Sequence, residues 1–399
     1  MKFHRNLINA VVKGLSEILL LNKQADTTVE NILQSNKGWG SRDRAFIADN
    51  IYTIVRYKRL YEFCSDAAAT NNEALFKLLA AKLILQGIEL PDWDEFKGVD
   101  ATAVLAKKQE AEGITKIRES IPDWLDDLGQ AQLGDSWPAE INALNQPAKF
   151  SIRINTLRTT KAALLAVFDK EGIAYIEVPG EPDALIIAGK KNFRNHFTYS
   201  SGWFEIQDAS SQLVAPFLDV KEGMQVIDAC AGGGGKTLHV AALMRNKGKI
   251  TALDINARKL EDLKRRAQRG GVNILTVNTA EPETIELLAN SADRLLLDVP
   301  CSGTGVLRRK PDAKWKLSAA FIEEIKQTQA GILDNYTTML KPGGILVYST
   351  CSILPAENKG QISSFLQRNK EFQLLDEKSV SPAQSGFDGF YMAKLKRKG

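Results

Sequence analysis

The carboxy-terminal half of the chain alternates short apolar segments with amphipathic ones, and this alternation restricts the possible folds more than any other feature. The strand-like segments are MQVIDAC (224–230), KITALDI (249–255), NILTVN (273–278), DRLLLDVP (293–300) and GGILVYST (343–350). Helix-like segments lie between them, such as ARKLEDLKRRAQRGG (257–271) and the stretch 319–344. This order predicts an α/β fold with a doubly wound, mostly parallel sheet and helices on both faces. Ligands of such sheets bind beyond the carboxyl ends of the strands, where every unusual motif of this half falls.

In residues 1–205 the apolar residues recur at different spacings, which predicts separate domains. The segment 41–64 carries an apolar stripe after Ser41, the expected N-cap of a helix, and a second apolar helix is expected to end at Gly87. From residue 146 the order strand, helix, strand indicates a small α+β module. The expected domains are a helical domain at 1–115, a helical linker at 116–145, the α+β module at 146–205 and the α/β domain at 206–399.

The composition narrows the class of protein less sharply. With 52 Lys and Arg against 48 Asp and Glu, the net charge of +4 is compatible with a nucleic-acid partner but is not evidence for one. The 4 cysteines and 3 histidines have no metal-like spacing, so we expect neither a metal site nor a disulfide scaffold. Lys13 and Glu17 interrupt the amino-terminal apolar run, and no stretch reaches the length of a membrane span. We therefore expect a cytoplasmic protein with reduced thiols and no membrane contact.

The stretch DACAGGGGKT (228–237) forms the turn after the first strand of the α/β domain. A phosphate-binding Walker loop needs a glycine five residues before its Gly-Lys pair, but Cys230 occupies that position, which argues against an NTPase. A glycine turn after the first strand, followed by an acidic residue at the end of the second, is typical of a nucleoside site. Asp254 holds that second position and is expected to bind both hydroxyl groups of a ribose.

Two cysteines follow the ends of strands that are neighbours in the usual order of such sheets. Asp298, Pro300 and Cys301 follow one strand, and Cys351 follows the next. Two thiols and a carboxylate beside a nucleoside cofactor suit the methylation of C5 of cytosine. A thiolate that adds to C6 makes C5 nucleophilic, and a carboxyl group at the base edge stabilises the charge that develops on the ring. An unperturbed thiol is mostly protonated at neutral pH, so the site must activate it.

Basic residues and a tryptophan follow Cys301 in LRRKPDAKWK (307–316), and further cations lie in KKNFRNHF (190–197) and in the tail KLKRKG. Cations can follow phosphates while an aromatic ring stacks on an unpaired base. The target cytosine must be unpaired or flipped out, because a base inside a duplex cannot reach a thiol. The residues expected to contact RNA are Arg308, Arg309, Lys310, Lys314 and Trp315.

The motifs DACAGGGGKT, DVPCSGTG and YSTCS followed by EN resemble the signatures of the Sun/Nop (RsmB-like) group of RNA cytosine-5 methyltransferases. The resemblance begins at IPDWL (121–125), reaches the C-terminus, and includes SIRINTLR, EIQDASSQLV and DGFYMAKL. More weakly, residues 1–115 resemble a NusB-like RNA-binding domain, above all at DRAFIADNIYTIVRYK. The resemblance implies a Rossmann-like methyltransferase domain with a seven-stranded sheet, preceded by an RRM-like module.

The resemblance also implies roles for individual residues. S-adenosylmethionine is the implied cofactor, and Cys351 is the implied nucleophile at C6, with Cys301 helping to resolve the adduct. Asp298 would contact the target cytosine, and Lys236 would lie near the reacting base. DNA cytosine-5 methyltransferases attack with their Pro-Cys cysteine, which would reverse the two roles, but the presence of both motifs favours the RNA group. The residues implied to bind the cofactor are Cys230, Ala231, Gly232, Gly233, Gly234, Gly235, Lys236, Asp254, Asn278 and Asp298.

Two residues depart from the pattern of the group. Gly233 stands where a proline is usual, and we expect a lower cofactor affinity because glycine loses more conformational entropy on ordering. Asn278 stands where an acidic residue usually lies near the adenine, and its amide can still hydrogen-bond that ring.

The expected function is the methylation of one cytosine in rRNA, with 16S rRNA as the favoured substrate. The protein is expected to act as a monomer. Two alternatives stay open: a tRNA cytosine-5 methyltransferase, and a non-catalytic RNA-binding factor in ribosome assembly. The intact Cys301, Asp298 and Cys351 argue against the second, since a binding module needs none of them.

Overall fold

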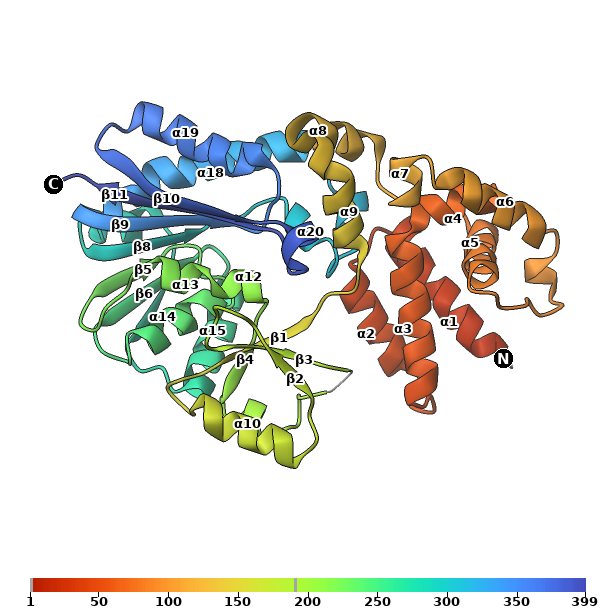
Figure 1. Cartoon of the computed structure of the whole chain (residues 1–399), viewed down its shortest axis with the longest axis horizontal. Coiled ribbons are helices and arrows are strands. Elements are labelled where there is room, and N and C mark those ends of the chain that lie inside the picture. The colour runs from red at the N-terminus through yellow and green to blue at the C-terminus, as the bar shows by residue number, and fades with distance from the viewer. Residues whose placement is uncertain (1–2, 190–191) are drawn as a thin grey trace. The chain divides into compact units, whose positions relative to one another are not determined.

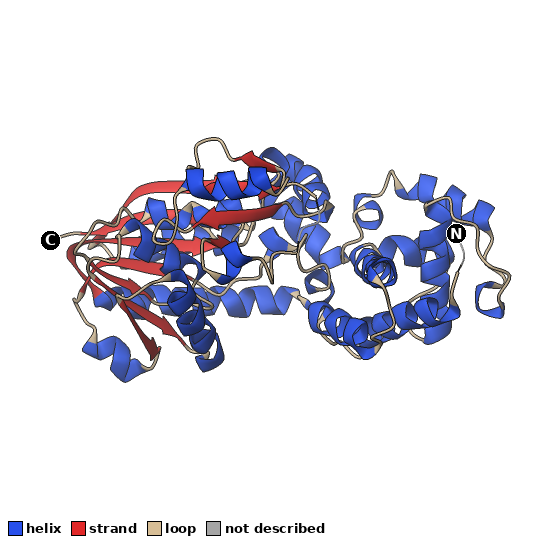
Figure 2. Cartoon of the chain, turned by 90° about the horizontal axis from the view of Figure 1, so that it is seen from below, coloured by secondary structure: helices blue, strands red, loops and turns tan. Residues whose placement is uncertain are grey.

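The structure is a computed structural model that describes residues 3–189 and 192–399 (Figure 1). Lys190 and Lys191 of the basic stretch KKNFRNHF lie outside the described residues. Every strand falls between residues 147 and 399, whereas the described residues before them contain only helices and loops (Figure 2). Among the described residues, we find no helix both long and apolar enough to cross a lipid bilayer.

The chain forms two compact units that differ from the four expected domains. One consists of Met1–Gln146 with Leu307–Ala319, and the other of Pro147–Val306 with Ala320–Gly399. The residues after 115 belong to the first unit because they bond to its bundle: the Arg59 backbone N–H donates to Ser120 Oγ at 2.8 Å, and its guanidinium donates to Ile121 O at 2.7 Å.

The first unit, called the helical unit below, packs around one apolar core. Its longest helices turn an apolar stripe inward, as Ile47, Ile51 and Ile54 do at helical spacing. Its helices are α1 (Arg5–Leu15), the π-helix η1 (Ser16–Leu20), α2 (Ala25–Ser35), α3 (Ser41–Arg56), α4 (Lys58–Ser65), α5 (Asn72–Leu85), η2 (Asp94–Phe96), α6 (Ala101–Ala111), α7 (Thr115–Arg118), α8 (Asp123–Leu133), η3 (Gly134–Ser136), α9 (Trp137–Asn145) and α17 (Ala313–Lys316).

Two expectations for these helices need adjustment. The segment 41–64 forms two helices because the backbone of Tyr57 leaves the helical region, with φ −109° and ψ 30°. Ser41 is the first residue of α3 and not its N-cap, which is Gly40, whose N–H donates to Asp43 Oδ2 at 3.0 Å. The expected end of α5 is confirmed, since Gly87 follows it with a left-handed φ of 71°.

The segment Leu307–Ala319 returns from the α/β domain into the helical unit. Its cations bond to carbonyl groups at the ends of short helices: Arg308 Nη2 donates to Ala143 O of α9 at 3.0 Å, and Lys314 Nζ donates to Glu119 O after α7 at 3.3 Å. Carbonyl groups at helix C-termini favour positive charge. Trp315 Nε1 donates to Val55 O at 2.7 Å, and its ring packs against the apolar core.

This arrangement corrects part of the predicted RNA surface. Lys314 is only 1% exposed and Arg308 only 4%, and Trp315 uses its indole N–H within the helical unit. These three side chains hold the segment to the bundle, and the burial of Lys314 and Arg308 leaves neither free to face a nucleic acid. RNA contact stays a prediction for Trp315 and Arg309, which are half-buried, and for Lys310, which is exposed.

The second unit begins with an antiparallel four-stranded sheet in the order β2-β3-β1-β4. The helix that follows β1 packs Leu164 and Phe168 against this sheet. The expected α+β module is therefore present, and the connection from β1 to β2 passes over β3, which lies between them. Its elements are β1 (Phe150–Ile154), α10 (Lys161–Lys170), β2 (Tyr175–Glu177), β3 (Ala184–Ile187), α11 (Phe197–Ser200) and β4 (Phe204–Ile206).

A seven-stranded sheet forms the rest of this unit, in the order β10-β11-β9-β8-β5-β6-β7. The strands from β5 to β9 pair in parallel, and β11 pairs antiparallel to both of its neighbours, which confirms the predicted mostly parallel sheet. The strands are β5 (Gln225–Asp228), β6 (Lys249–Asp254), β7 (Leu275–Thr279), β8 (Ala292–Asp298), β9 (Leu340–Thr350), β10 (Phe372–Val380) and β11 (Phe390–Arg397).

Helices cover both faces of this sheet, as predicted. Helices α18 and α19 bury Leu333 and Phe365 on one face, while α13 and α14 bury Phe217 and Val240 on the other (Figure 1). The helices of this part are α12 (Ala209–Gln212), α13 (Val214–Phe217), α14 (Gly235–Leu243), α15 (Ala257–Gly270), α16 (Pro282–Leu287), η4 (Thr304–Val306), α18 (Ala319–Tyr336), η5 (Thr337–Met339), η6 (Pro355–Glu357), α19 (Lys359–Arg368) and α20 (Pro382–Ser385).

The place of Trp315 leads to a testable expectation. Trp315→Phe keeps most of the ring but removes the hydrogen bond to Val55 O, so it should lower the free energy of unfolding of the helical unit by about 1–2 kcal/mol. Trp39→Phe is the matched control, because Trp39 packs on the same core and its buried Nε1 has no acceptor among the described residues. Urea unfolding of the full chain measures both. An equal loss in the two variants would contradict the placement.

Candidate active site

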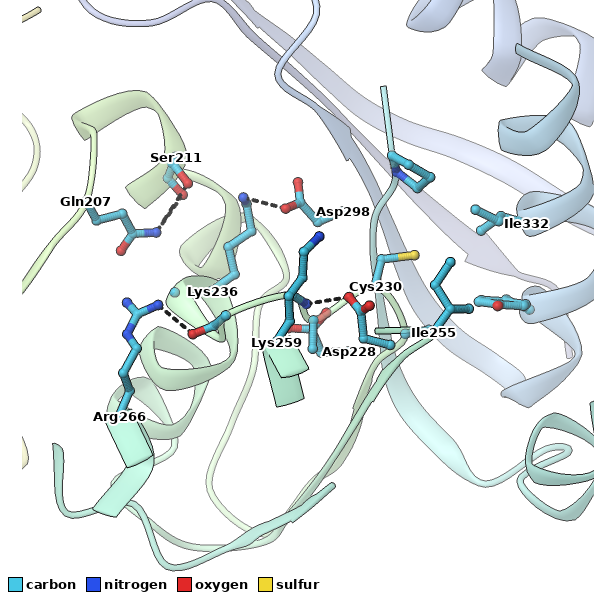
Figure 3. A pocket seen from close by; sticks show the side chains of 18 of the residues that line it. Gln207, Ser211, Asp228, Cys230, Lys236, Ile255, Lys259, Arg266, Asp298 and Ile332 are labelled. Atoms are coloured by element: carbon cyan, nitrogen blue, oxygen red, sulfur yellow. Dashed lines mark hydrogen bonds and ion pairs between the residues drawn. The ribbon is translucent and has the colours of Figure 1, made fainter. Parts of the chain in front are cut away.

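A cavity of about 540 Å³ lies at the carboxyl ends of β5, β6 and β8, where the sheet order predicts a ligand. Its wall is formed by the loop after β5, Asp254 at the end of β6, Asp298 at the end of β8, side chains of α15 and α18, and the segment after β4 (Figure 3). All of these elements belong to the second unit.

The glycine loop depends on glycine at two of its positions. Gly232 and Gly234 have left-handed φ angles of 53° and 83°, which other residues adopt only at a cost. A Cβ atom on Gly234 would also lie 2.0 Å from Leu263 Cδ1 of α15. The loop therefore presents bare backbone to the cavity and leads directly into α14, whose first residue is Gly235.

Asp254 lies at the cavity, as the sequence predicts, and also holds the glycine loop. Its Oδ2 accepts a hydrogen bond from the Gly232 N–H at 2.8 Å, and its Oδ1 accepts one from the Asn256 N–H at 2.8 Å. Each carboxylate oxygen can accept a second bond, so the group can still bind two hydroxyl groups. Asn278, by contrast, is exposed on β7 and is not among the residues that line the cavity.

Lys236 and Asp298 form an ion pair at the cavity, with Nζ and Oδ2 2.7 Å apart (Figure 3). The other carboxylate oxygen of Asp298 accepts a hydrogen bond from Ser349 Oγ at 2.9 Å, which fixes the plane of the carboxylate. The ammonium group lies 4.8 Å from the centre of the Phe390 ring, within the range of a cation–π contact. The structure thus brings together two residues that the sequence predicts at the reacting base.

The structure also brings together Cys301 and Cys351, whose Sγ atoms are 3.3 Å apart and not bonded as a disulfide. The hydrogen bond from Cys301 lowers the pKa of Cys351, and Lys236 adds to this effect, while burial and Asp298 oppose it. The same hydrogen bond raises the pKa of Cys301 well above that of a free thiol, and burial adds to the rise. With Cys301 as the donor, the shared hydrogen bond favours the thiolate form of Cys351.

The glycine motif also contains Asp228, which is buried, and Cys230, which is partly buried and lines the cavity. Burial raises the pKa of the Cys230 thiol well above its usual range, which suits a side chain that packs rather than reacts. Burial also raises the pKa of Asp228 to about 7, although Thr237 Oγ1 donates a hydrogen bond to its Oδ2 at 2.6 Å. Asp228 Oδ1 has no hydrogen-bond partner in the described part of the chain.

Several cavity residues were missed by the sequence analysis. The segment after β4 supplies Gln207 and Ser211, and α15 supplies Arg266, which donates to Gly233 O and pairs with Glu205 at 2.9 Å. Gln207 falls in EIQDASSQLV, a stretch that resembles the Sun/Nop group but gives no indication of which of its residues bind a ligand. Across the cavity lie Thr328, Ile332 and Tyr336, which recur every four residues on α18. That spacing is also that of an ordinary core helix, so it gave no signal of a site.

Comparison with known proteins agrees with this geometry. A family model described as 16S rRNA methyltransferase RsmB/F matches residues 215–396, and one described as an RsmF/B-like ferredoxin-like domain matches 121–194. Ribosomal RNA small subunit methyltransferase B of Yersinia enterocolitica is 29% identical over 99% of both chains, and that of Serratia proteamaculans is 35% identical over 69% of this chain and 66% of its own. A crystallised methyltransferase homolog protein from Pyrococcus horikoshii has a TM-score of 0.64 and 27% identity over 71% of this chain and 97% of its own.

The seven-stranded sheet, its glycine turn and the acidic residue after β6 define a Rossmann-like methyltransferase, and its methyl donor is S-adenosylmethionine. Within that class, the chain belongs to the RsmB/F methyltransferase family, which the sequence motifs had indicated.

The glycine loop gives a first prediction for this site. Gly234→Ala should raise the Kd of S-adenosylmethionine at least about tenfold, because the left-handed backbone costs roughly 1–2 kcal/mol and the new methyl group collides with Leu263. Gly233→Ala is the control: its φ lies outside the left-handed region, and its Cβ would lie 3.3 Å from the end of the flexible Arg266 side chain. Isothermal titration calorimetry measures both, and a similar loss in the two variants would contradict the assigned role of Gly234.

Asp228 gives a second, pH-dependent prediction. Since its folded pKa of about 7 lies above that of the unfolded chain, its contribution to stability is complete below the unfolded pKa of roughly 4 and is lost as the pH rises from there through about 7. Asp228→Asn cannot ionise, so the fall in Tm between about pH 5 and pH 7 should be smaller in the variant than in the wild type. Differential scanning calorimetry at both pH values tests this, and parallel Tm curves would show that Asp228 ionises normally.

Proposed function

We propose that this protein transfers a methyl group from S-adenosylmethionine to C5 of a cytosine in rRNA, through a covalent bond between Cys351 and C6. The observation that carries the proposal is the pair of thiols 3.3 Å apart, with the Lys236–Asp298 ion pair facing the cavity nearby. A methyltransferase that acts on nitrogen or oxygen has no need of a paired thiol, because those atoms are nucleophilic already. The family and relatives named for rRNA support RNA as the substrate class.

The cavity fits the proposed cofactor. Gly232 and Gly234 keep the loop backbone free of side chains, and the Asp254 carboxylate can accept hydrogen bonds from the ribose hydroxyl groups. Ile332 and Tyr336 offer apolar surface for a purine ring. When bound, S-adenosylmethionine supplies an electrophilic methyl group to the base.

The two cysteines have different roles because their pKa values differ. Cys351, whose pKa is lowered by the hydrogen bond from Cys301, supplies the thiolate that bonds to C6 and moves the C5=C6 electron pair towards C5. Asp298, oriented by Ser349, accepts a hydrogen bond from the edge of the base, and the Lys236 ammonium group paired with it stabilises the negative charge that develops on the ring. After the methyl group is on C5, loss of the C5 proton restores the double bond and expels the Cys351 thiolate.

We infer that Cys301 accepts that C5 proton, because its Sγ lies 3.3 Å from that of Cys351. While Cys351 is a thiolate, its negative charge and the shared hydrogen bond hold Cys301 in its protonated form. Once Cys351 is bonded to carbon, that charge is gone, and the Cys301 thiol releases its own proton to solvent more easily. Cys301 thus becomes a base only after the adduct has formed, which gives the second cysteine its role in resolution.

The proposal is tested by bisulfite sequencing of unmodified 16S, 23S and tRNA pools after incubation with the purified protein and S-adenosylmethionine. We expect one protected cytosine in 16S rRNA, and no protection with Cys351→Ala. Cys64→Ala is the matched control, because Cys64 is buried in the helical unit and should leave the protection unchanged. Protection in tRNA would favour a tRNA methyltransferase, and a Cys351→Ala protein with full activity would overturn the covalent mechanism.

A further inference from the structure

We propose that Glu357 is a positioning residue that ties the two cysteine-bearing loops together and so sets the geometry of the Cys301–Cys351 pair. This inference rests on the proposed function, because it assigns a residue that serves the same two thiols. Glu357 lies in η6, after β9, and is fully buried.

The carboxylate of Glu357 bonds to the residue that directly follows each cysteine. Ser302, next to Cys301, donates its backbone N–H to Oε2 at 2.8 Å and its hydroxyl group to Oε1 at 2.5 Å. Ser352, next to Cys351, donates its hydroxyl group to Oε1 at 2.6 Å. One oxygen atom is therefore shared by the two loops, and the position of either cysteine depends on the same carboxylate.

Buried polar groups fix Glu357 in turn. Gln329 of α18 donates its amide to Oε2 at 3.0 Å and also to Pro300 O at 3.0 Å, so it holds the segment before Cys301 as well. The hydroxyl group of Tyr348 on β9 donates to Glu357 O at 2.7 Å. The carboxylate thus accepts four hydrogen bonds from three separate segments of the chain, and a buried carboxylate held in this way keeps those segments in one arrangement.

Glu357 also places a negative charge near both thiols. The other groups that influence the thiols are Lys236 and Asp298 beside Cys351, and Tyr348 near Cys301. Glu357 raises the pKa of each cysteine. This effect is smaller than that of burial and smaller than that of the mutual hydrogen bond, which raises the pKa of Cys301 and lowers that of Cys351. A change at Glu357 should therefore be visible in the pH dependence of thiol reactivity, which a residue that only stabilised the fold would not alter.

Two substitutions separate the charge of Glu357 from its length. Glu357→Gln keeps the length but removes the charge, so the midpoint pH of iodoacetamide alkylation of Cys351 should fall. Glu357→Asp keeps the charge but cannot reach both serines, so this midpoint should stay near that of the wild type. Both variants should lose kcat at least about tenfold with a nearly unchanged KM for S-adenosylmethionine, because small displacements of reacting groups are costly in rate.

The matched control is Thr337→Val, which removes a buried hydroxyl group bonded to Leu333 O at 2.8 Å in the same unit, away from the thiols. If Glu357→Gln does not fold, Ser302→Ala and Ser352→Ala each remove part of the network and should each lower kcat more than the control. Folded Glu357 variants with an unchanged kcat and an unchanged alkylation midpoint would overturn the proposal, as would a kcat loss no greater than that of Thr337→Val.

The alkylation experiment is carried out on the full chain without RNA or S-adenosylmethionine, and mass spectrometry assigns the label to each cysteine. It therefore reports on the thiols even if the wild type methylates no cytosine. In that case the proposed function fails while an altered alkylation midpoint still supports the positioning role. If the wild type methylates cytosine and the Glu357→Gln protein has the same kcat and the same alkylation midpoint, the positioning role alone is overturned.

Discussion

The site depends on the parallel pairing of β5, β8 and β9, which brings three strand ends to one edge of the sheet. The register pairs Asp228 with Leu296, and Asp298 with Ser349 two residues before Cys351. Because parallel strands end together, side chains from distant parts of the chain meet without any loop having to fold across the sheet. The Lys236–Asp298 ion pair and the cysteine pair both follow from this single constraint.

Much of this arrangement could be predicted because its signals are local. Alternating apolar and amphipathic segments predicted the parallel sheet, which is present, and the glycine run predicted a turn whose Gly232 and Gly234 do require left-handed φ angles. The positions of Cys301 and Cys351 directly after predicted strands were enough to expect them side by side. A motif at a strand end is informative because the strand fixes where it lies.

The remaining features depend on contacts between residues far apart in the sequence. The basic segment 307–316 has the composition of an RNA surface, yet Lys314 is buried and its ammonium group donates to Glu119 O and Asn145 Oδ1 of the helical unit. Glu357 falls in the EN of the quoted signature, but the signature does not show that its carboxylate accepts four hydrogen bonds from Ser302, Ser352 and Gln329. Composition and periodicity describe a segment, but they do not say which other segment will pack against it.

The central claim, that Cys351 attacks C6 of a cytosine, is tested most directly by locating the adduct. The Cys301→Ala protein is incubated with RNA and S-adenosylmethionine, digested with protease and nuclease, and analysed by mass spectrometry. Because Cys301 is the group proposed to resolve the adduct, we expect a methylated cytidine nucleotide to accumulate on the peptide that contains Cys351. An adduct on Cys301 in the Cys351→Ala protein, with none on Cys351 in the Cys301→Ala protein, would contradict the assignment and reverse the two roles.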